Sequence, residues 1–274
     1  MRQGTHMPYR HAHWYILGLF PLIALAYWPG YLSTLPTASW QFHLHGLTAF
    51  AWLMLLAAQS WTIQHGERET HRLAGLSSLV LFPLFMAGGA ALFFGMAAKM
   101  NAGSEFHVLF APQLAWLDTA SVAMMVAFYH QALRHRRKVK LHSAYMLATV
   151  IPLLPPILGR LSGIPLGVRG PGTLHLLYPG FIAAQLVAAA VALLIARGRG
   201  ADGRPWLWAA LVSTLGALAF ATIGSLPAWR NLYALLANVP QAPIIVAAGA
   251  FGALVAWSGW NAGKRPSQSG ALPA

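Results

Sequence analysis

The sequence predicts an all-α protein: a polytopic bundle of about eight transmembrane helices. The chain is 57% hydrophobic and only 8% charged, whereas soluble domains are about a quarter charged. Apolar runs of about 20 residues, the length that crosses a bilayer core, recur along the chain. Arginine and lysine collect in alternate connections between these runs, as the positive-inside rule describes. The three observations agree on a multi-pass membrane protein.

The apolar runs set the predicted spans in order along the chain. They cover roughly residues 14–34, 41–63, 74–97, 112–133, 142–162, 173–196, 205–226 and 240–262. No small-residue cleavage pattern follows the first run, so we predict a helix there and not a secretory signal. The segment 227–239 is predicted to be either an interfacial helix or an extension of a neighbouring span.

The basic residues predict the orientation of the chain. Alternate connections hold 14 of the 18 Lys and Arg residues, which places both termini in the cytoplasm of a bacterial inner membrane. Residues 1–13 are then a cytoplasmic segment, 14–262 a single transmembrane domain, and 263–274 a disordered cytoplasmic tail. The formal charge of +13 is assigned to loops beside anionic lipid. The predicted partner is the bilayer, and no nucleic acid.

The chemistry available to the chain is narrow. Without cysteine, disulfides, thiolate metal sites and cysteine nucleophiles are excluded. Asp118 is the one carboxylate inside a predicted span, about six residues and so roughly 9 Å from Pro112 at the outer edge. Because ionisable groups inside a membrane mark a functional site or a buried pair, Asp118 is the first candidate site residue.

Three residues from other spans are predicted to share the depth of Asp118, namely His45, Arg160 and His175. In one interpretation, His45, Asp118 and His175 bind one transition metal ion (Zn, Cu or Fe) or haem. Arg160 then orients an anionic ligand, and Asp118 and Arg160 are the candidate catalytic residues of a metal- or haem-dependent oxidoreductase. In the others, Asp118 and Arg160 form a structural ion pair beside interfacial histidines, or the group relays protons or substrate.

Local patterns refine this outer site. His43 and His45 point about 200° apart on a helix, so we expect His45, which shares its stripe with Thr48 and Trp52, to face the bundle and His43 to face headgroups. Three prolines precede Arg160 in "IPLLPPILGR". Proline removes a backbone donor and disturbs a helix, so a broken helix is predicted there, with either a pocket or a simple kink.

A second pair of candidates lies on the cytoplasmic side. His71 and His142 each fall in the first turn of a predicted helix, where the dipole attracts lipid phosphate or quinone oxygen. They are therefore the candidate cofactor-binding residues. They stand in the similar turns "HGERETHRLAGL" and "HRRKVKLHSAYML", a short internal repeat.

Several motifs resemble one group of uncharacterised bacterial multi-pass membrane proteins, over residues 40–180. Those proteins show HG…AW, LHRRLG, an Asp and HKRLMLLAT…R in order. This chain shows "HGLTAFAW", "THRLAGL", Asp118 and "LHSAYMLATVIPLLPPILGR", departing from the pattern at Ser143 and Ala144. The resemblance implies distant kinship with cytochrome-oxidase-associated or haem-carrying membrane proteins, and no agreed activity.

Three functions therefore remain open from the sequence. The first is a redox protein with a metal or haem near the periplasmic face. The second is a carrier or assembly factor for a metal, a lipid or a small hydrophobic compound, and the third is a lipid-modifying enzyme. A small hydrophobic substrate or a quinone is the expected ligand. His45 and His65 stand 20 residues or about 30 Å apart, which disfavours a transmembrane dihaem arrangement.

Overall fold

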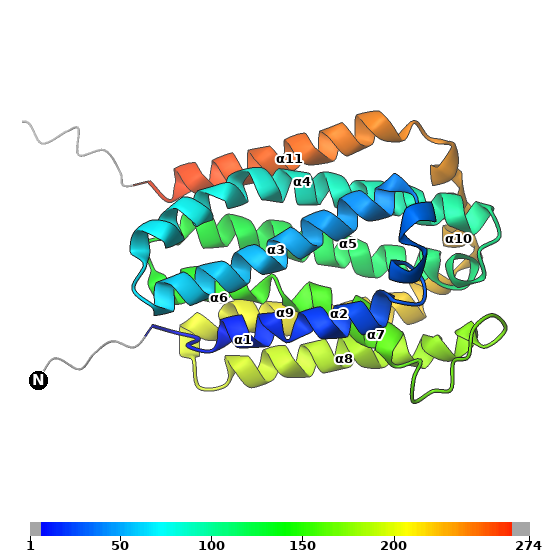
Figure 1. Ribbon diagram of the computed structural model, residues 1–274, viewed down its shortest axis with the longest axis horizontal. Coiled ribbons are helices and arrows are strands. Elements are labelled where there is room, and N and C mark those ends of the chain that lie inside the picture. Colours follow the sequence, from blue (N-terminus) through cyan, green and yellow to red (C-terminus); the bar gives the residue numbers. More distant parts are fainter. Residues whose placement is uncertain (1–6, 265–274) are drawn as a thin grey trace, which may run out of the picture.

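The computed structural model describes residues 7–264 as helices and loops, with no strand among them (Figure 1). The all-α prediction is thereby confirmed. The helices are α1 (Ala12–Leu17), α2 (Leu19–Tyr27), α3 (Trp40–Gln64), α4 (Arg68–Asn101), α5 (Glu105–Arg134), α6 (Val139–Ala148), α7 (Leu154–Leu161), α8 (Leu177–Ala196), α9 (Arg204–Ala221), α10 (Pro227–Ala234) and α11 (Gln241–Ala262). The parts of the predicted terminal segments in 1–6 and 265–274 lie outside the described residues.

Seven helical segments are long and apolar enough to cross a membrane, and they match seven of the eight predicted spans. They are Trp40–Gln64, Arg68–Asn101, Glu105–Arg134, Val139–Leu161, Leu174–Ala196, Gly200–Ser225 and Gln241–Ala262. The first predicted span is a shorter apolar helix, Ala12–Tyr27, below the length of about 20 residues that crosses a bilayer core. Its crossing stays a prediction.

The bundle has two chemically different ends. The connections α3–α4 and α5–α6 and the start of α9 carry the arginine-rich turns, and we call this the basic end. The first and last described residues both lie there (Figure 1), as the prediction of both termini on one side requires. Arg160 and α10 lie at the other end, here called the opposite end.

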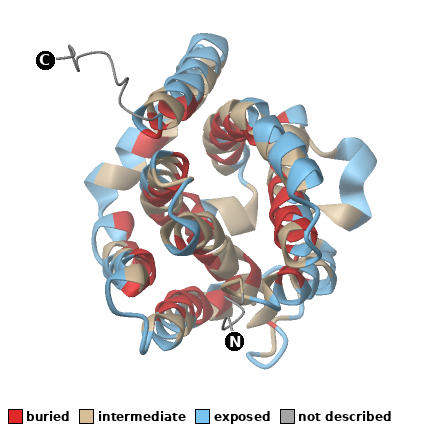
Figure 2. Ribbon diagram, turned by 90° about the vertical axis from the view of Figure 1, so that its left-hand side faces the viewer, coloured by how far each residue is buried: buried red, intermediate tan, exposed pale blue. Residues whose placement is uncertain are grey.

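Glycine lets α3 and α4 pack closely. A Cβ atom on Gly88 of α4 would stand 2.8 Å from the Thr48 side-chain oxygen and 3.1 Å from the His45 Cα on α3. Small residues at such crossings drive helix association in membranes, where burial of apolar surface contributes little. Buried residues accordingly line the inner faces of the helices, and exposed residues the outer faces (Figure 2).

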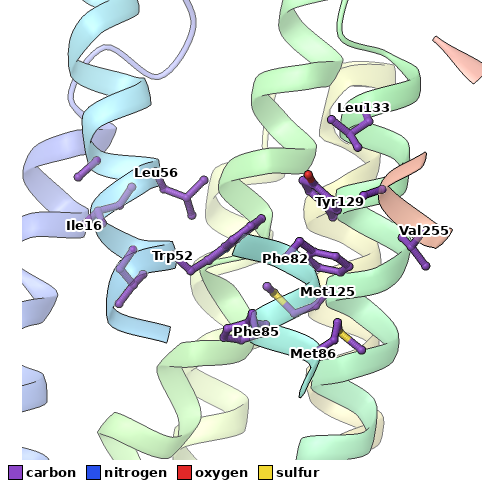
Figure 3. Packing of buried hydrophobic residues seen from close by; sticks show 13 residues of the cluster. Ile16, Trp52, Leu56, Phe82, Phe85, Met86, Met125, Tyr129, Leu133 and Val255 are labelled. Atoms are coloured by element: carbon purple, nitrogen blue, oxygen red, sulfur yellow. The ribbon is translucent and has the colours of Figure 1, made fainter. Parts of the chain in front are cut away.

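The core centres on Trp52 of α3, whose side chain is 0% exposed. Its ring lies 5.7 Å from Phe82, 6.1 Å from Phe85 and 5.4 Å from Tyr129, centroid to centroid (Figure 3). Its Nε1 donates to the Thr149 hydroxyl at 3.1 Å. A buried N–H in this environment needs such an acceptor, so the bond fixes α3 against the end of α6.

Two irregular segments shape the opposite end. The fifth predicted span is broken as expected: α6 ends at Ala148, a 3₁₀ turn covers Ile151–Leu153, and α7 begins at Leu154. The uncertain segment 227–239 contains a separate helix, α10, and not an extension of α9 or α11. Two side chains tie α10 down, because the Trp229 Nε1 donates to the Pro112 carbonyl at 2.7 Å and the Tyr233 hydroxyl to the Phe93 carbonyl at 3.1 Å.

Two adjacent glycines of α4 should respond oppositely to alanine. Gly88→Ala forces a Cβ against α3 and should lower the free energy of unfolding by about 1–3 kcal/mol, the usual cost of overpacking. A Cβ atom on Gly89 would have nothing within 4 Å of it, so Gly89→Ala should be neutral or stabilising by up to about 1 kcal/mol. Thermal unfolding of purified protein in detergent measures both. Equal effects of the two substitutions would contradict the close α3–α4 contact.

Candidate functional site

Arg160, in the last turn of α7, lies among aromatic rings from three other helices. Its Cζ is 4.6 Å from the ring centroid of Tyr27 on α2, 5.2 Å from that of Phe106 on α5 and 6.0 Å from that of Phe181 on α8. Its Nη1 donates to the Pro156 carbonyl at 2.9 Å. Cation–π contacts of this kind hold a guanidinium in place while leaving most of its donors free.

Asp118 stands near Arg160 but does not pair with it. Within residues 7–264 its carboxylate has no hydrogen-bond partner and no ion pair within 4.0 Å; only burial and the more distant charge of Arg160 act on it. The direct ion pair considered from the sequence is therefore not formed. The Arg160 charge also acts on His45 and His107, so the four side chains share one electrostatic neighbourhood.

The two neighbouring histidines of α3 have different surroundings, and the headgroup contact of His43 stays a prediction. The Tyr31 hydroxyl is hydrogen bonded to the His43 Nδ1 at 2.8 Å. The His45 ring instead lies 5.8 Å from Phe85 of α4, centroid to centroid. The His45 Nδ1 is buried and has no hydrogen-bond partner within the described part of the chain. His45 is thus a polar group inside the bundle whose hydrogen-bonding capacity is unused.

His107 belongs to this neighbourhood and was missed from the sequence. It lies on α5, with its Nδ1 2.9 Å from the Ser104 hydroxyl and its ring 5.9 Å from Phe42 of α3. The predicted span began at residue 112, whereas α5 begins at Glu105. Eleven residues separate His107 from Asp118, about three turns, so both face the same way. That spacing was the signal that could have identified His107.

His175 does not join the site. It is exposed and lines an open groove of about 400 Å³ together with Tyr178, Arg230 and the Leu109 face of α5. Leu109 and Asp118 are nine residues apart, so at about 100° per residue they point in opposite directions. The groove therefore lies on the other side of α5 from Asp118, which corrects the prediction that His175 joins the other three.

Without His175, the predicted metal site lacks one of its three ligands. Among residues 7–264 no group of three or more His, Asp or Glu side chains is close enough to hold a metal ion. His45, Asp118 and His175 therefore do not form the predicted three-ligand site. The prediction took Pro112 as the outer edge of a helix that begins at Glu105, and it did not consider the direction of each side chain around α5.

Asp118 also reaches toward α10. Burial raises the pKa of the Tyr233 phenol, and the Asp118 carboxylate contributes in the same direction. Tyr233 is 0% exposed. The short helix α10, bonded to α5 and α4, thus lies near Asp118.

His71 and His142 lie at the basic end, each as the fourth residue of its helix, α4 and α6. The first-turn positions predicted for them are confirmed. They belong to a different part of the molecule from Asp118 and Arg160. Ala144, where the resembling proteins have a basic residue, is 0% exposed, so a cationic side chain would not fit at that position in this packing.

Comparison of the chain with protein-family models, with curated proteins and with solved structures found no match. The resemblance drawn from the sequence motifs therefore stays a prediction. Function has to be argued from the side chains that the fold brings together.

Replacing Tyr27 tests the aromatic enclosure of Arg160. Tyr27→Leu removes the nearest ring and should lower the free energy of unfolding by about 0.5–2 kcal/mol, the range of cation–π contacts. Tyr27→Phe keeps the ring and should retain stability close to that of the unmodified protein. Tyr15→Leu, at a side chain that is 78% exposed, is the matched control. Chemical denaturation followed by fluorescence measures all three, and equal losses for Leu and Phe would show that the ring face is not what matters.

Proposed function

We propose that the protein is a multi-pass protein of a bacterial inner membrane that binds a small lipid-soluble molecule of the quinone class inside its opposite end. The binding residues are Arg160, Asp118 and His45. One observation carries the proposal: the Arg160 charge acts on both His45 and Asp118, yet none of these three half-buried side chains satisfies another, and the His45 Nδ1 is a buried atom without a partner in the described residues. Buried polar groups in proteins are normally paired, so a ligand that pairs with all of them is the simplest partner.

The donor and acceptor inventory suggests the chemistry of the ligand. The guanidinium of Arg160 has five N–H donors, and one Nη1 bond to the Pro156 carbonyl is its only hydrogen bond within the described residues. Its free donors suit a carbonyl or anionic oxygen. Asp118 accepts from a hydroxyl, and His45 can donate or accept through Nδ1. A quinone presents two carbonyl oxygens, and its quinol form presents two hydroxyls, so either form can use this set.

The apolar surroundings support a ring-bearing and lipid-soluble ligand. Tyr27, Phe106 and Phe181 surround Arg160, and Phe85 lies against His45. Ligand sites are typically apolar and aromatic, with a few polar groups that fix orientation. The break between α6 and α7 lies one helix, α7, before Arg160, and in lipid such irregular backbone occurs where protein or a cavity can satisfy it.

The carrier alternative is favoured by a separate observation. The open groove beside His175 and Arg230 reaches the same end of the bundle and is lined mainly by apolar side chains. A lipid chain with an anionic head would fit that combination. The carrier would then move a phosphate-bearing lipid, and the quinone class would be replaced by a lipid phosphate. A three-ligand metal centre at Asp118 is not part of either proposal.

Ligand titration tests the proposal. Protein in nanodiscs is titrated with a short-chain ubiquinone while tryptophan fluorescence is recorded. Asp118→Asn and Arg160→Gln should each weaken binding about 10- to 100-fold, because a hydrogen bond to a charged group contributes about 1.5–3 kcal/mol. His175→Ala, at the exposed histidine outside the site, should leave the affinity unchanged.

Two outcomes would contradict the proposal. If the short-chain quinone binds equally well to folded Asp118→Asn, Arg160→Gln and unmodified protein, these residues do not form its site. If quinone does not bind but a short-chain phosphatidic acid does, and His175→Ala weakens it, the groove is the binding site and the carrier alternative is correct.

A further inference from the structure

Two helical hairpins at the basic end present a histidine in the same way. The His71 Nδ1 on α4 lies 3.1 Å from the Gln59 carbonyl on α3, and the His142 Nδ1 on α6 lies 2.9 Å from the Ala132 carbonyl on α5. A carbonyl only accepts, so each Nδ1 carries the hydrogen, and in the neutral ring the Nε2 keeps its lone pair. Histidines that bind metals are oriented in this way, by an Nδ1–H bond to a carbonyl.

The core places both histidines in one layer. Trp52 of α3 is bonded to Thr149 at the end of α6. Gln59 lies seven residues after Trp52 on α3, and His142 lies seven residues before Thr149 on α6. Seven residues are two turns or about 10 Å, and both steps lead toward the basic end. The imidazole of His142 is accordingly close enough to feel the charge of His71.

The hydrogen bond between Ser78 and Tyr129 in the core places His71 in the same layer, independently of Trp52. The Ser78 hydroxyl of α4 is 2.9 Å from the Tyr129 hydroxyl of α5. His71 lies seven residues before Ser78, toward the basic end and on the same face of α4. The Gln59 side chain locks this position further, since its Nε2 donates to the His71 carbonyl at 2.9 Å while its own backbone carbonyl accepts from the imidazole.

Two other histidines at the basic end, His65 and His135, contact a carbonyl of their own helix and not of a neighbouring helix. His65 and His135 also approach a carbonyl, at 2.8 and 2.9 Å, but the carbonyl is that of the residue four positions earlier, Trp61 or Gln131. His65 is exposed, and its ring is stacked on Trp61 at 4.3 Å. Only His71 and His142 reach the carbonyl of a neighbouring helix from inside this layer.

We propose that His71 and His142 are the two axial ligands of a haem at the basic end. Zinc sites use three or four protein ligands, and no group of three or more such side chains occurs within residues 7–264. An iron porphyrin brings four equatorial nitrogens and needs at most two from the protein. Two oriented imidazoles in one layer therefore match the ligand number of a haem better than that of a bare metal ion.

The charge of the basic end suits the same group. A haem carries two propionates, and arginine pairs strongly with carboxylates. Arg72 follows His71 and is exposed, while Arg136 is close enough to His142 for its charge to act there. The haem site is separate from Arg160 and Asp118, so it goes beyond the proposed ligand binding and can fail without it.

Haemin titration tests the assignment. The full-length protein in nanodiscs is titrated with haemin, and absorption and electron paramagnetic resonance spectra are recorded. We expect one haem per chain with the spectrum of a six-coordinate, low-spin iron. His71→Ala and His142→Ala should each abolish the low-spin spectrum of the haem that stays with the protein after desalting, because one axial ligand is lost. His65→Ala and His135→Ala are the matched controls and should keep it.

The proposal is overturned if folded, unmodified protein takes up no stoichiometric haemin, or if the low-spin spectrum survives in the His71→Ala/His142→Ala double variant. Far-ultraviolet circular dichroism and monodisperse elution of each variant separate loss of ligation from misfolding. Quinone titration of the same variants should give the affinity of the unmodified protein, so a failure here is distinguishable from a failure of the opposite-end site.

Discussion

The structure depends on the hydrogen bonds that satisfy the few polar side chains buried in the apolar bundle. At its centre, the indole N–H of Trp52 is bonded to the Thr149 hydroxyl, and the Tyr129 hydroxyl to that of Ser78. These bonds join α3 to α6 and α4 to α5. Because an unsatisfied polar group in lipid costs several kcal/mol, they fix the relative register of the four helices. The shared layer of His71 and His142 follows from that register.

The two ends of the core use polar groups differently. At the basic end, backbone carbonyls of neighbouring helices hold the Nδ1 atoms of His71 and His142, so the imidazoles are oriented and their outer nitrogens are free. At the opposite end, Arg160 is held by aromatic rings, while Asp118 and the Nδ1 of His45 have no partner in the described part of the chain. The first arrangement suits coordination, and the second suits a ligand with oxygen atoms.

Aromatic contacts run from the opposite end to the centre of the core. The ring of His45 lies against Phe85, Phe85 against Trp52, and Trp52 against Tyr129, with centroid separations of 5.8, 6.1 and 5.4 Å. These packed rings therefore link the opposite-end site to the centre of the core.

The sequence predicted most of the fold because apolar length and basic loops are strong signals in membrane proteins. It also identified the direction of His45, since the polar stripe through Thr48 and Trp52 has helical period. It did not predict that His175 faces away from Asp118, because rotation around α5 depends on how α5 packs against its neighbours. His107 was missed because the span was taken to begin at Pro112, although the apolar run of α5 already includes Phe106 and residues 108–111. The carbonyl partners of His71 and His142 depend on contacts between helices, which no single segment encodes.

The proposed function requires that buried polar groups at the opposite end are completed by a small molecule and not by one another. A high-resolution electron cryomicroscopy map of the protein in nanodiscs made from native membrane lipid would decide this. We expect non-protein density in contact with the Arg160 guanidinium and within hydrogen-bond distance of Asp118. Apolar packing against Arg160 without such density, with Asp118 and Arg160 in direct contact, would contradict the proposed ligand site.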